Sequence, residues 1–448
     1  MNNTKAEQLN SKESNSSDLL ERFFKLKEHG SSVKNELIGG ITTFATMAYI
    51  IFVNPSIMAA SGMDAGAVFV ATCIGAAIGS LLMGLFANWP VGLAPGMGLN
   101  AFFSFTVVGE MGYSWEVALG AVFISGILFV GMSFYKVREW IIESIPESLR
   151  YSMTAGVGLF LGLIGLKTAG IVVDNPATLV SLGNFAEPNA LLAAICFLII
   201  AVLSERKIFG AVLVGIISVT LIGMGLGLVQ YQGIFSAPPS IAPTFMAMDI
   251  QGALNISMVS VILAFLFVNM FDTAGTLMGV ADRANLMNKE TGKIEGLSKA
   301  LKADSVSSVA GAFVGCPPVT SYVESASGVA AGGRTGLSAV FIALLFLAAI
   351  FLSPLAAMIP SYATAGALIY VAFIMMGSMQ HINWREFTDA TPAAITTLMM
   401  PLTFSIANGI ALGFITYTVL KVATGKTKDV SISMYILTTV FVAKLVYI

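Results

Sequence analysis

Long apolar runs, separated by short polar or charged connections, recur from about residue 36 to the end of this 448-residue chain. Runs such as "AICFLIIAVL" and "AVFIALLFLAAIFL" lie in stretches close to the ~20 residues that a helix needs to cross a membrane. The pattern predicts an all-α polytopic protein of the lipid bilayer with fourteen spans. The predicted spans are 36–60, 66–88, 91–108, 115–135, 151–172, 189–204, 208–229, 254–280, 302–316, 319–334, 337–358, 362–379, 388–405 and 406–424.

Composition supports this class. Hydrophobic residues make up 56% of the chain and charged residues 11%, which excludes an ordinary soluble domain, and the net charge of −2 argues against nucleic acid as a partner. Residues 1–35 carry six Lys or Arg and no long apolar run, so we expect a polar cytoplasmic tail. Cys73, Cys196 and Cys316 lack the spacing of metal ligands, and we expect packing roles for them, no metal and no bound cofactor.

The distribution of Lys and Arg predicts the orientation. With the N-terminus in the cytoplasm, the basic residues fall mainly in loops that follow even-numbered spans, as the positive-inside rule requires. Lys167, near the outer end of the fifth span, is the one clear exception. We therefore expect a multi-pass protein of the cytoplasmic (inner) membrane with a cytoplasmic N-terminus.

Four short matches occur in the same order in the two halves of the chain, at offsets that drift only from 215 to 199 residues. Because seven spans is an odd number, the second copy must sit inverted in the bilayer, an arrangement typical of transporters. We expect a first repeat at 36–230, an inverted second repeat at 254–424 and a C-terminal apolar segment, 425–448, of uncertain placement. The matches are "FVN" at 52–54 and 267–269, "IP" at 145–146 and 359–360, "TAG" at 154–156 and 364–366, and "GAVLVG" at 210–215 with "GIALG" at 409–413.

The third span of each repeat is interrupted by prolines and glycines. Span 3 reads "NWPVGLAPGMGLNAFFSF", and span 10 lies in "GCPPVTSYVESASGVAAGG". Neither can form an unbroken helix, and broken backbone at membrane depth is tolerated only where it is buried in protein or faces a cavity. We expect each span to run as an extended piece into a short helix, with the two helix N-termini converging at a binding site.

Three polar residues, in spans 3, 8 and 10, are candidates for function. Glu324 falls near the start of the span 10 helix, where Ser321-x-x-Glu324 also fits a capping box. Asp272 lies inside span 8, where its alternative role is a structural partner to a neighbouring helix. Asn100 lies in the span 3 helix, where it could act as an N-cap. A carboxylate at the bilayer centre is expensive to insert, which favours a functional role for the acidic pair.

The absence of basic residues from the same spans limits the kinds of cargo that the site can bind. Two carboxylates without a cationic partner suggest proton coupling, with the proton as the coupling ion. The missing Lys, Arg and His speak against an anion. A neutral, planar cargo rich in hydrogen-bonding groups fits best, and Tyr322 is the aromatic residue most readily placed against its ring.

The chain also resembles a known family, the nucleobase–cation symporter-2 proteins, and within it the purine permeases for adenine, guanine and hypoxanthine. The resemblance runs from about residue 20 to 425 and rests on "ATCIGAAIGSLLMGLFANWPVGLAPGMGLNAFF", "VNMFDTAGTLMGV", "DSVSSVAGAFVG" and "SYVESASGVAAGGRTGL". It implies fourteen spans in an inverted 7+7 repeat with core and gate domains, a homodimer and proton symport of a purine nucleobase, with adenine favoured. In relatives that carry uracil, a His occupies the position of Thr276. The implied binding residues are Asp272, Glu324, Asn100, Tyr322, Thr276 and Ser321, of which Asp272 and Glu324 are also the candidates for carrying the proton.

Other functions stay open at this point. A xanthine or uracil permease of the same family would fit the fold, as would an anion transporter of the same fold, which would need a basic residue at the site. A passive channel would not need two interrupted repeats. An intramembrane enzyme would need a nucleophile with its base or metal ligands inside the bilayer, so we expect that the protein is not an enzyme.

Overall fold

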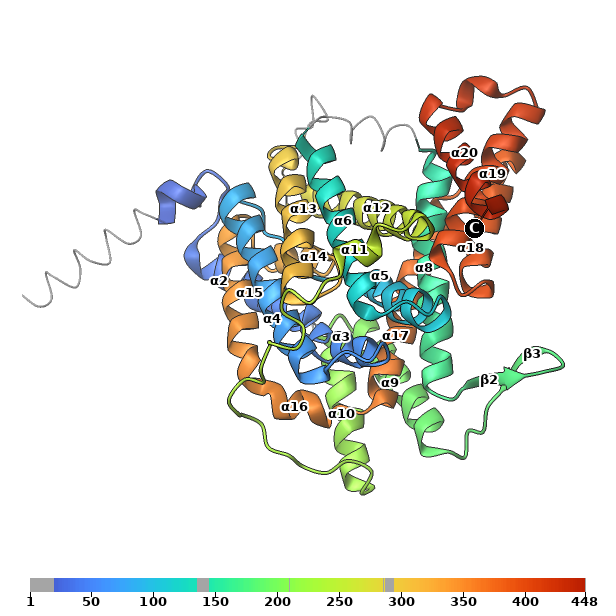
Figure 1. Ribbon diagram of the computed structural model, residues 1–448. Helices are drawn as coiled ribbons and strands as arrows, with labels where there is room; N and C mark the ends of the chain where they lie inside the picture. Colours follow the sequence, from blue (N-terminus) through green and yellow to red (C-terminus); the bar gives the residue numbers. More distant parts are fainter. Residues whose placement is uncertain (1–19, 135–144, 209, 285, 287–293, 448) are drawn as a thin grey trace, which may run out of the picture.

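Helices make up most of the protein in a computed structural model, which describes residues 20–134, 145–208, 210–284, 286 and 294–447 (Figure 1). Every one of the fourteen predicted spans coincides with a helix, or with a broken stretch of helix and strand. In the first half these are α2 (Val33–Met47), α3 (Ile50–Ala59), α4 (Ala65–Leu82) with a π-helical turn (Met83–Ala87), β1 (Leu93–Pro95), α5 (Met97–Ala101) with a π-helix (Phe102–Glu110), α6 (Trp115–Phe134), α8 (Glu147–Thr168), α9 (Pro188–Glu205) and α10 (Ala211–Gly225).

The second half repeats this order of elements. It begins with the short α11 (Ile250–Ala253), which the sequence did not predict. The spans that follow are α12 (Val259–Arg283), α13 (Leu297–Val314), β4 (Val319–Ser321), α14 (Ser325–Ala330), α15 (Gly336–Ala349), α16 (Ser353–Met358), α17 (Ser361–Met376), α18 (Phe387–Leu402) and α19 (Ile406–Ala423), before a final α20 (Ile432–Tyr447).

Nine of the helices within the described ranges are long and apolar enough to cross a membrane by length and composition. The other predicted spans are the two broken ones and helices that are shorter or more polar, such as α10 and α13. The protein is thus a multi-pass membrane protein, whereas the count of fourteen spans stays a prediction.

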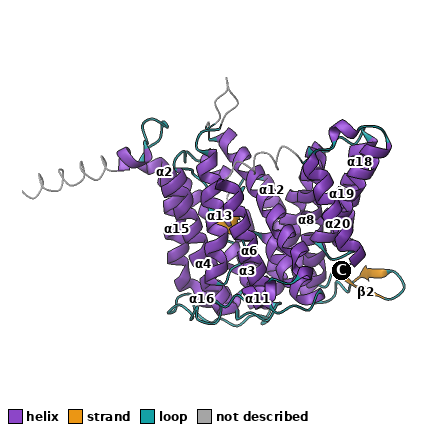
Figure 2. Ribbon diagram, turned by 45° about the horizontal axis from the view of Figure 1, so that its top comes forward, coloured by secondary structure: helices purple, strands orange, loops and turns teal. Residues whose placement is uncertain are grey.

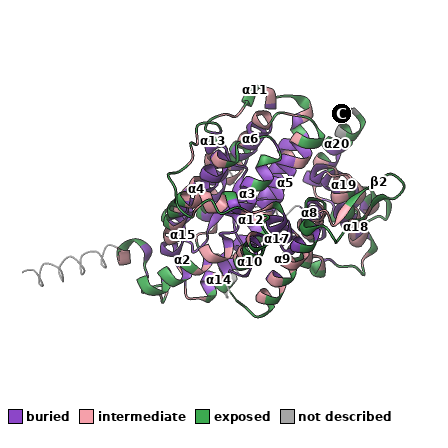
Figure 3. Cartoon of the chain, turned by 90° about the horizontal axis from the view of Figure 1, so that it is seen from below, coloured by how far each residue is buried: buried purple, intermediate pink, exposed green. Residues whose placement is uncertain are grey.

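The helices form two groups. In one group, α2, α3, α4, α6, α12, α13, α14 and α15 pack against one another and enclose α5, β1 and β4; in the other, α8, α9, α10, α17, α18 and α19 pack together. These groups are the core and the gate that the resemblance implied. Buried residues gather around α3, α5 and α12, in the middle of the molecule (Figure 3).

The two interrupted spans meet in an antiparallel pair of short strands. Leu93 lies opposite Ser321 and Pro95 opposite Val319, so β1 and β4 continue in opposite directions into α5 and α14. Gly315, with φ +87°, ends α13 in a left-handed turn, and Pro317 and Pro318 follow after Cys316, which prevents α13 from continuing into β4. The predicted extended pieces leading into short helices are confirmed.

The repeated "FVN" motif makes equivalent contacts in both halves. Asn54 Nδ2 donates to Thr72 Oγ1 at 2.7 Å, and Asn269 Nδ2 donates to Ser308 Oγ at 2.8 Å. Each bond joins the first span of a repeat to the second. The internal repeat read from the sequence therefore corresponds to a repeated packing contact.

A hairpin at one end of the bundle was not predicted. Its strands, β2 (Val172–Asn175) and β3 (Leu179–Leu182), connect α8 to α9 and extend away from the helices (Figure 2). Lys167, the exception to the charge pattern, lies in the last turn of α8, and its Nζ is 3.6 Å from Asp174 of the hairpin. The exposed pair gives this lysine a local partner.

The C-terminal helix α20 folds back along α19. Thr418 and Thr438 share a hydrogen bond of 2.8 Å, and the rings of Phe414 and Phe441 are 5.5 Å apart. Both pairs have nearly the same sum of residue numbers, as antiparallel helices require. After the loop that follows α19, α20 therefore runs antiparallel to α19 and alongside it.

Candidate functional site

The site is built where β1 and β4 cross, because their pairing sets the start of both short helices. Gly96 is the N-cap of α5, and its N–H donates to the carbonyl of Pro318 at 3.0 Å. Val319 packs against Gly79 of α4 and Gly311 of α13, where a Cβ at either glycine would lie 2.8 Å from a valine methyl. The missing side chains let β4 sit this close to its helices.

Two of the predicted site residues are the carboxylates of α12 and α14. Asp272 lies midway along α12, and Glu324 is the N-cap of α14; both are partly buried. Glu324 Oε1 accepts a hydrogen bond of 2.7 Å from the hydroxyl of Tyr49, which lies between α2 and α3. Thr273, next to Asp272, is 2.9 Å from Thr320 of β4, and α12 packs against both β4 and α14, so the structure places the two carboxylates on adjacent elements.

A third buried carboxylate, Asp304 of α13, was missed by the sequence reasoning. It is fully buried, and its Oδ1 accepts both the N–H (2.8 Å) and the hydroxyl (2.7 Å) of Ser321. Its Oδ2 accepts the hydroxyl of Thr273 at 2.7 Å, and Thr273 is in turn 2.9 Å from the hydroxyl of Thr320. Asp304 thus holds β4 against α12, one residue from Asp272.

Another carboxylate outside the predicted set also has a structural role. Glu36 of α2 is fully buried and accepts the backbone N–H groups of Arg334, Thr335 and Ser338 at 3.0–3.3 Å. It therefore caps the start of α15, as an acidic side chain at a helix N-terminus does.

The contacts of Ser321 and Glu324 overturn the capping-box alternative. The hydroxyl of Ser321 donates to Asp304, and Glu324 makes no side-chain capping hydrogen bond in α14. The N-cap alternative for Asn100 is also wrong, because Gly96 occupies that position in α5. Asn100 is fully buried, its Nδ2 donates to Asn54 Oδ1 at 2.6 Å, and its Oδ1 has no hydrogen-bond partner within the described part of the chain.

Tyr322 and Thr276 complete the predicted set. Tyr322 is 6% exposed, and its hydroxyl donates to the carbonyl of Pro95, which ties the second repeat to β1 of the first. Thr276 is 8% exposed and lies one turn beyond Asp272 on α12. The structure therefore places all six predicted residues around the β1–β4 pair, but the hydroxyl groups of Ser321 and Tyr322 already form hydrogen bonds within the protein.

A small cavity of about 30 Å³ lies between core and gate beside Asp272. Space of this size holds about one water molecule, so a larger cargo requires the two domains to move apart. Asp272 is the one charged residue of its lining. The lining consists of Gly96, Gly98, Leu99, Val268, Phe271 and Asp272 from the core, and Met153, Thr154, Val157 and Met375 from the gate.

Inverted repeats, two facing interrupted spans and a carboxylate cavity between two helical domains define a membrane transporter. Solved structures share the fold. The transmembrane domain of the bicarbonate transporter BicA of a cyanobacterium superposes with a TM-score of 0.62 at 18% identity, covering 84% of this chain and 96% of that one. The murine anion transporter Slc26a9 gives a TM-score of 0.60 at 11% identity, covering 88% and 69%.

The chain belongs to the Permease family, whose model matches residues 34–412. It is 53% identical to the adenine permease AdeP of Escherichia coli, over 96% of each chain. It is 49% identical to the adenine permease AdeQ of the same organism, over 97% of this chain and 98% of that one. The guanine/hypoxanthine permease PbuG of Bacillus subtilis is 45% identical, over 96% and 100%. The resemblance seen in the sequence is confirmed, and the protein is a permease and not an enzyme.

Proposed function

We propose that this permease imports a purine nucleobase by proton symport, with adenine favoured over hypoxanthine and guanine. The observation that carries the proposal is the pair of carboxylates on the two elements that flank β4: Asp272 of α12, which lines the cavity between core and gate, and Glu324 at the start of α14. Carboxylate oxygens accept the N–H groups that a neutral purine presents at its edge. The identity to permeases named for adenine and for guanine/hypoxanthine supports the same cargo class.

Asp272 and Glu324 are the groups that would also carry the coupling proton. A carboxyl group in a poorly solvated site can take up a proton as neutral acid and release it when the surroundings open to water. The hydroxyl of Tyr49 holds one oxygen of Glu324 in place and leaves the other oxygen for the base or the proton. Asn100, Tyr322, Thr276 and Ser321 would shape the site around this pair.

Transport would proceed by alternating access. The space for about one water beside Asp272 requires core and gate to separate before a purine can enter. An anion transporter of this fold is the second candidate, since both solved relatives are anion carriers. The cavity lining favours the nucleobase, because it contains a carboxylate and no Lys, Arg or His.

Uptake of radiolabelled adenine in cells that lack their own purine permeases tests the proposal. We expect uptake that collapses with a protonophore and that falls to background in Glu324→Gln, while the exposed Glu187→Gln serves as the matched control. Unlabelled hypoxanthine, guanine, xanthine and uracil as competitors would rank the cargo. Full activity of Glu324→Gln would refute the role of Glu324, and stronger competition by uracil would favour a uracil permease.

For the orientation, we propose a cytoplasmic N-terminus in the cytoplasmic membrane and α20 as an additional span. The 16 residues of α20 run antiparallel to α19, and Ile432, Ile436 and Val446 on its other face are exposed. The C-terminus would then lie outside. A C-terminal alkaline phosphatase fusion should be active, and a fluorescent C-terminal GFP fusion would contradict this placement. The homodimer stays a prediction from the resemblance.

A further inference from the structure

A second, larger cavity lies between core and gate at the far end of the Phe102–Glu110 π-helix. Its volume is about 290 Å³, close to the lower end of the range for small-molecule pockets. The cavity is thus far larger than the one beside Asp272. Its lining includes Thr106, Glu110, Ser260, Val261, Ser405 and Asn408.

The two cavities are arranged along the same pair of elements. The span 3 helix lines the small cavity at Leu99 and the large one at Thr106, and α12 lines them at Val268 and Val261. Seven residues of α12 correspond to about 10 Å along its axis. The large cavity therefore continues the core–gate boundary beyond the small one.

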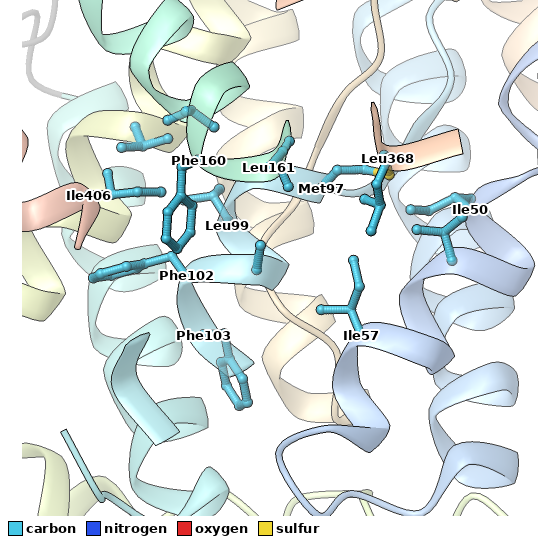
Figure 4. Close-up of a cluster of buried hydrophobic side chains, with 14 of the residues drawn as sticks. Ile50, Ile57, Met97, Leu99, Phe102, Phe103, Phe160, Leu161, Leu368 and Ile406 are labelled. Atoms are coloured by element: carbon cyan, nitrogen blue, oxygen red, sulfur yellow. The ribbon is translucent and has the colours of Figure 1, made fainter. Parts of the chain in front are cut away.

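Buried aromatic rings separate the two cavities. Phe102 and Phe265, which lie between the two sets of lining residues, form an edge-to-face pair with ring centres 5.1 Å apart. Phe160 and Ile406, both from the gate, lie beside Phe102 in the same buried apolar cluster (Figure 4). A ligand in the large cavity is thus kept from Asp272 by an apolar barrier that must open for passage.

The polar groups of the large cavity are held in place by the fold. The Thr106 hydroxyl donates to the carbonyl of Phe404 at 2.6 Å, across the core–gate boundary. Ser405 caps α19 by accepting the N–H of Asn408 at 3.3 Å. Glu110 forms no ion pair with any described residue, so its carboxylate can accept hydrogen bonds from a ligand.

We propose that this cavity is a second nucleobase site, an access site in which Glu110 accepts the N–H groups of a neutral purine before it reaches Asp272. The proposal rests on the proposed function. It commits to the same ligand class, because one carboxylate surrounded by an amide, three hydroxyl groups and apolar walls complements a neutral ring that carries both N–H groups and acceptors. In the proposed orientation the site opens to the outside, where cargo is captured.

Equilibrium binding of radiolabelled adenine to the purified full-length protein tests the stoichiometry. We expect two sites in the wild type, one tight and one weaker. Asp272→Asn should remove the tight site and retain the weaker one. Glu110→Gln should weaken the second site about tenfold, the scale of a lost charged hydrogen bond, and leave the tight site unchanged.

A matched control and an uptake measurement sharpen the test. Glu116→Gln makes the same change of charge in the next element, outside the cavity lining, and should leave both sites intact. In uptake, Glu110→Gln should raise KM with little change in kcat. Asn408→Ala should act in the same direction through the opposite wall.

The outcomes separate this proposal from the proposed function. A single site per chain that Asp272→Asn abolishes would overturn the access site and leave nucleobase transport supported. A weaker site that responds equally to Glu110→Gln and Glu116→Gln would also overturn it. If the wild type binds no nucleobase at all, both proposals fall.

Discussion

Asp304 offers the sharpest test of how the site is held together. Replacement by Ala removes the acceptor of the N–H and the hydroxyl of Ser321, both of which are buried. Thr273 loses its bond to Asp304 as well, but it can turn to Thr320 at 2.9 Å. The change therefore leaves two buried donors without an acceptor.

The expected cost of Asp304→Ala follows from these two donors. Each unsatisfied buried group costs about 1–3 kcal/mol, so the variant should be destabilised by about 2–6 kcal/mol. Asp304→Asn retains one side-chain oxygen for Ser321, and it should lose less, about 1–3 kcal/mol. At about 2 °C per kcal/mol for a large protein, the Ala variant should unfold about 4–12 °C below the wild type.

The three buried cysteines provide the assay, because a thiol-reactive fluorophore reports their exposure when the solubilised protein unfolds on heating. Ser307→Ala is the matched control on α13: its hydroxyl bonds the carbonyl of Ala303 within the same helix, so its loss should shift the midpoint little. An Asp304→Ala midpoint equal to that of Ser307→Ala would refute the reasoning. So would an Asn variant as unstable as the Ala variant.

Three further changes test other contacts. Tyr49→Phe removes the hydrogen bond to Glu324, and we expect the KM of nucleobase uptake to rise about tenfold, whereas an unchanged KM would contradict a role for this bond. Gly98→Ala places a Cβ against Val157 of α8 across the core–gate boundary, so uptake should fall to background in protein that still reaches the membrane. Uptake equal to that of the wild type would show that the side chains at this boundary can shift to make room. Lys426, 2.7 Å from Glu386, lowers the pKa of this exposed carboxylate from 4.5 to about 2. The stabilisation that ionised Glu386 gives the folded protein is complete above pH 4.5 and is lost as the pH falls through 2. The difference in unfolding temperature between wild type and Glu386→Gln should therefore be smaller at about pH 3 than at about pH 7. A difference that stays constant with pH would contradict the role of this ion pair.

The spans and their interruptions could be predicted because both depend on local chemistry. Bilayer thickness fixes the length of an apolar run, and proline removes a backbone donor wherever it stands. The same reasoning could not give the register of Leu93 against Ser321, since this pairing depends on how two distant spans are packed. The β2–β3 hairpin was missed because its few alternating residues lie in a polar connection between two long apolar runs.

The contacts of the site residues were less accessible to sequence reasoning. Asp304 lies near the predicted start of span 9, two residues after Lys302. At that position an acidic residue is expected to belong to the water-exposed end of the helix. Its signal was present in "DSVSSVAGAFVG", one of the stretches that carry the family resemblance, but its partner Ser321 is known only from the fold. Tyr49 likewise gives no local hint that it reaches Glu324, 275 positions along the chain.

The arrangement of contacts indicates which parts can move during transport. The two repeats are joined at the site by the β1–β4 pairing and by the bonds from Tyr49 to Glu324 and from Tyr322 to Pro95. A motion of one repeat against the other would break all of these buried polar contacts. Separation of core from gate would instead open the apolar cluster around Phe102 and break bonds such as that from Thr106 to the carbonyl before Ser405. Because this boundary is mainly apolar and breaks fewer buried polar contacts, under the proposed alternating access we expect the core to move as one body that carries both repeats' parts of the site, with the change of access at the boundary between core and gate.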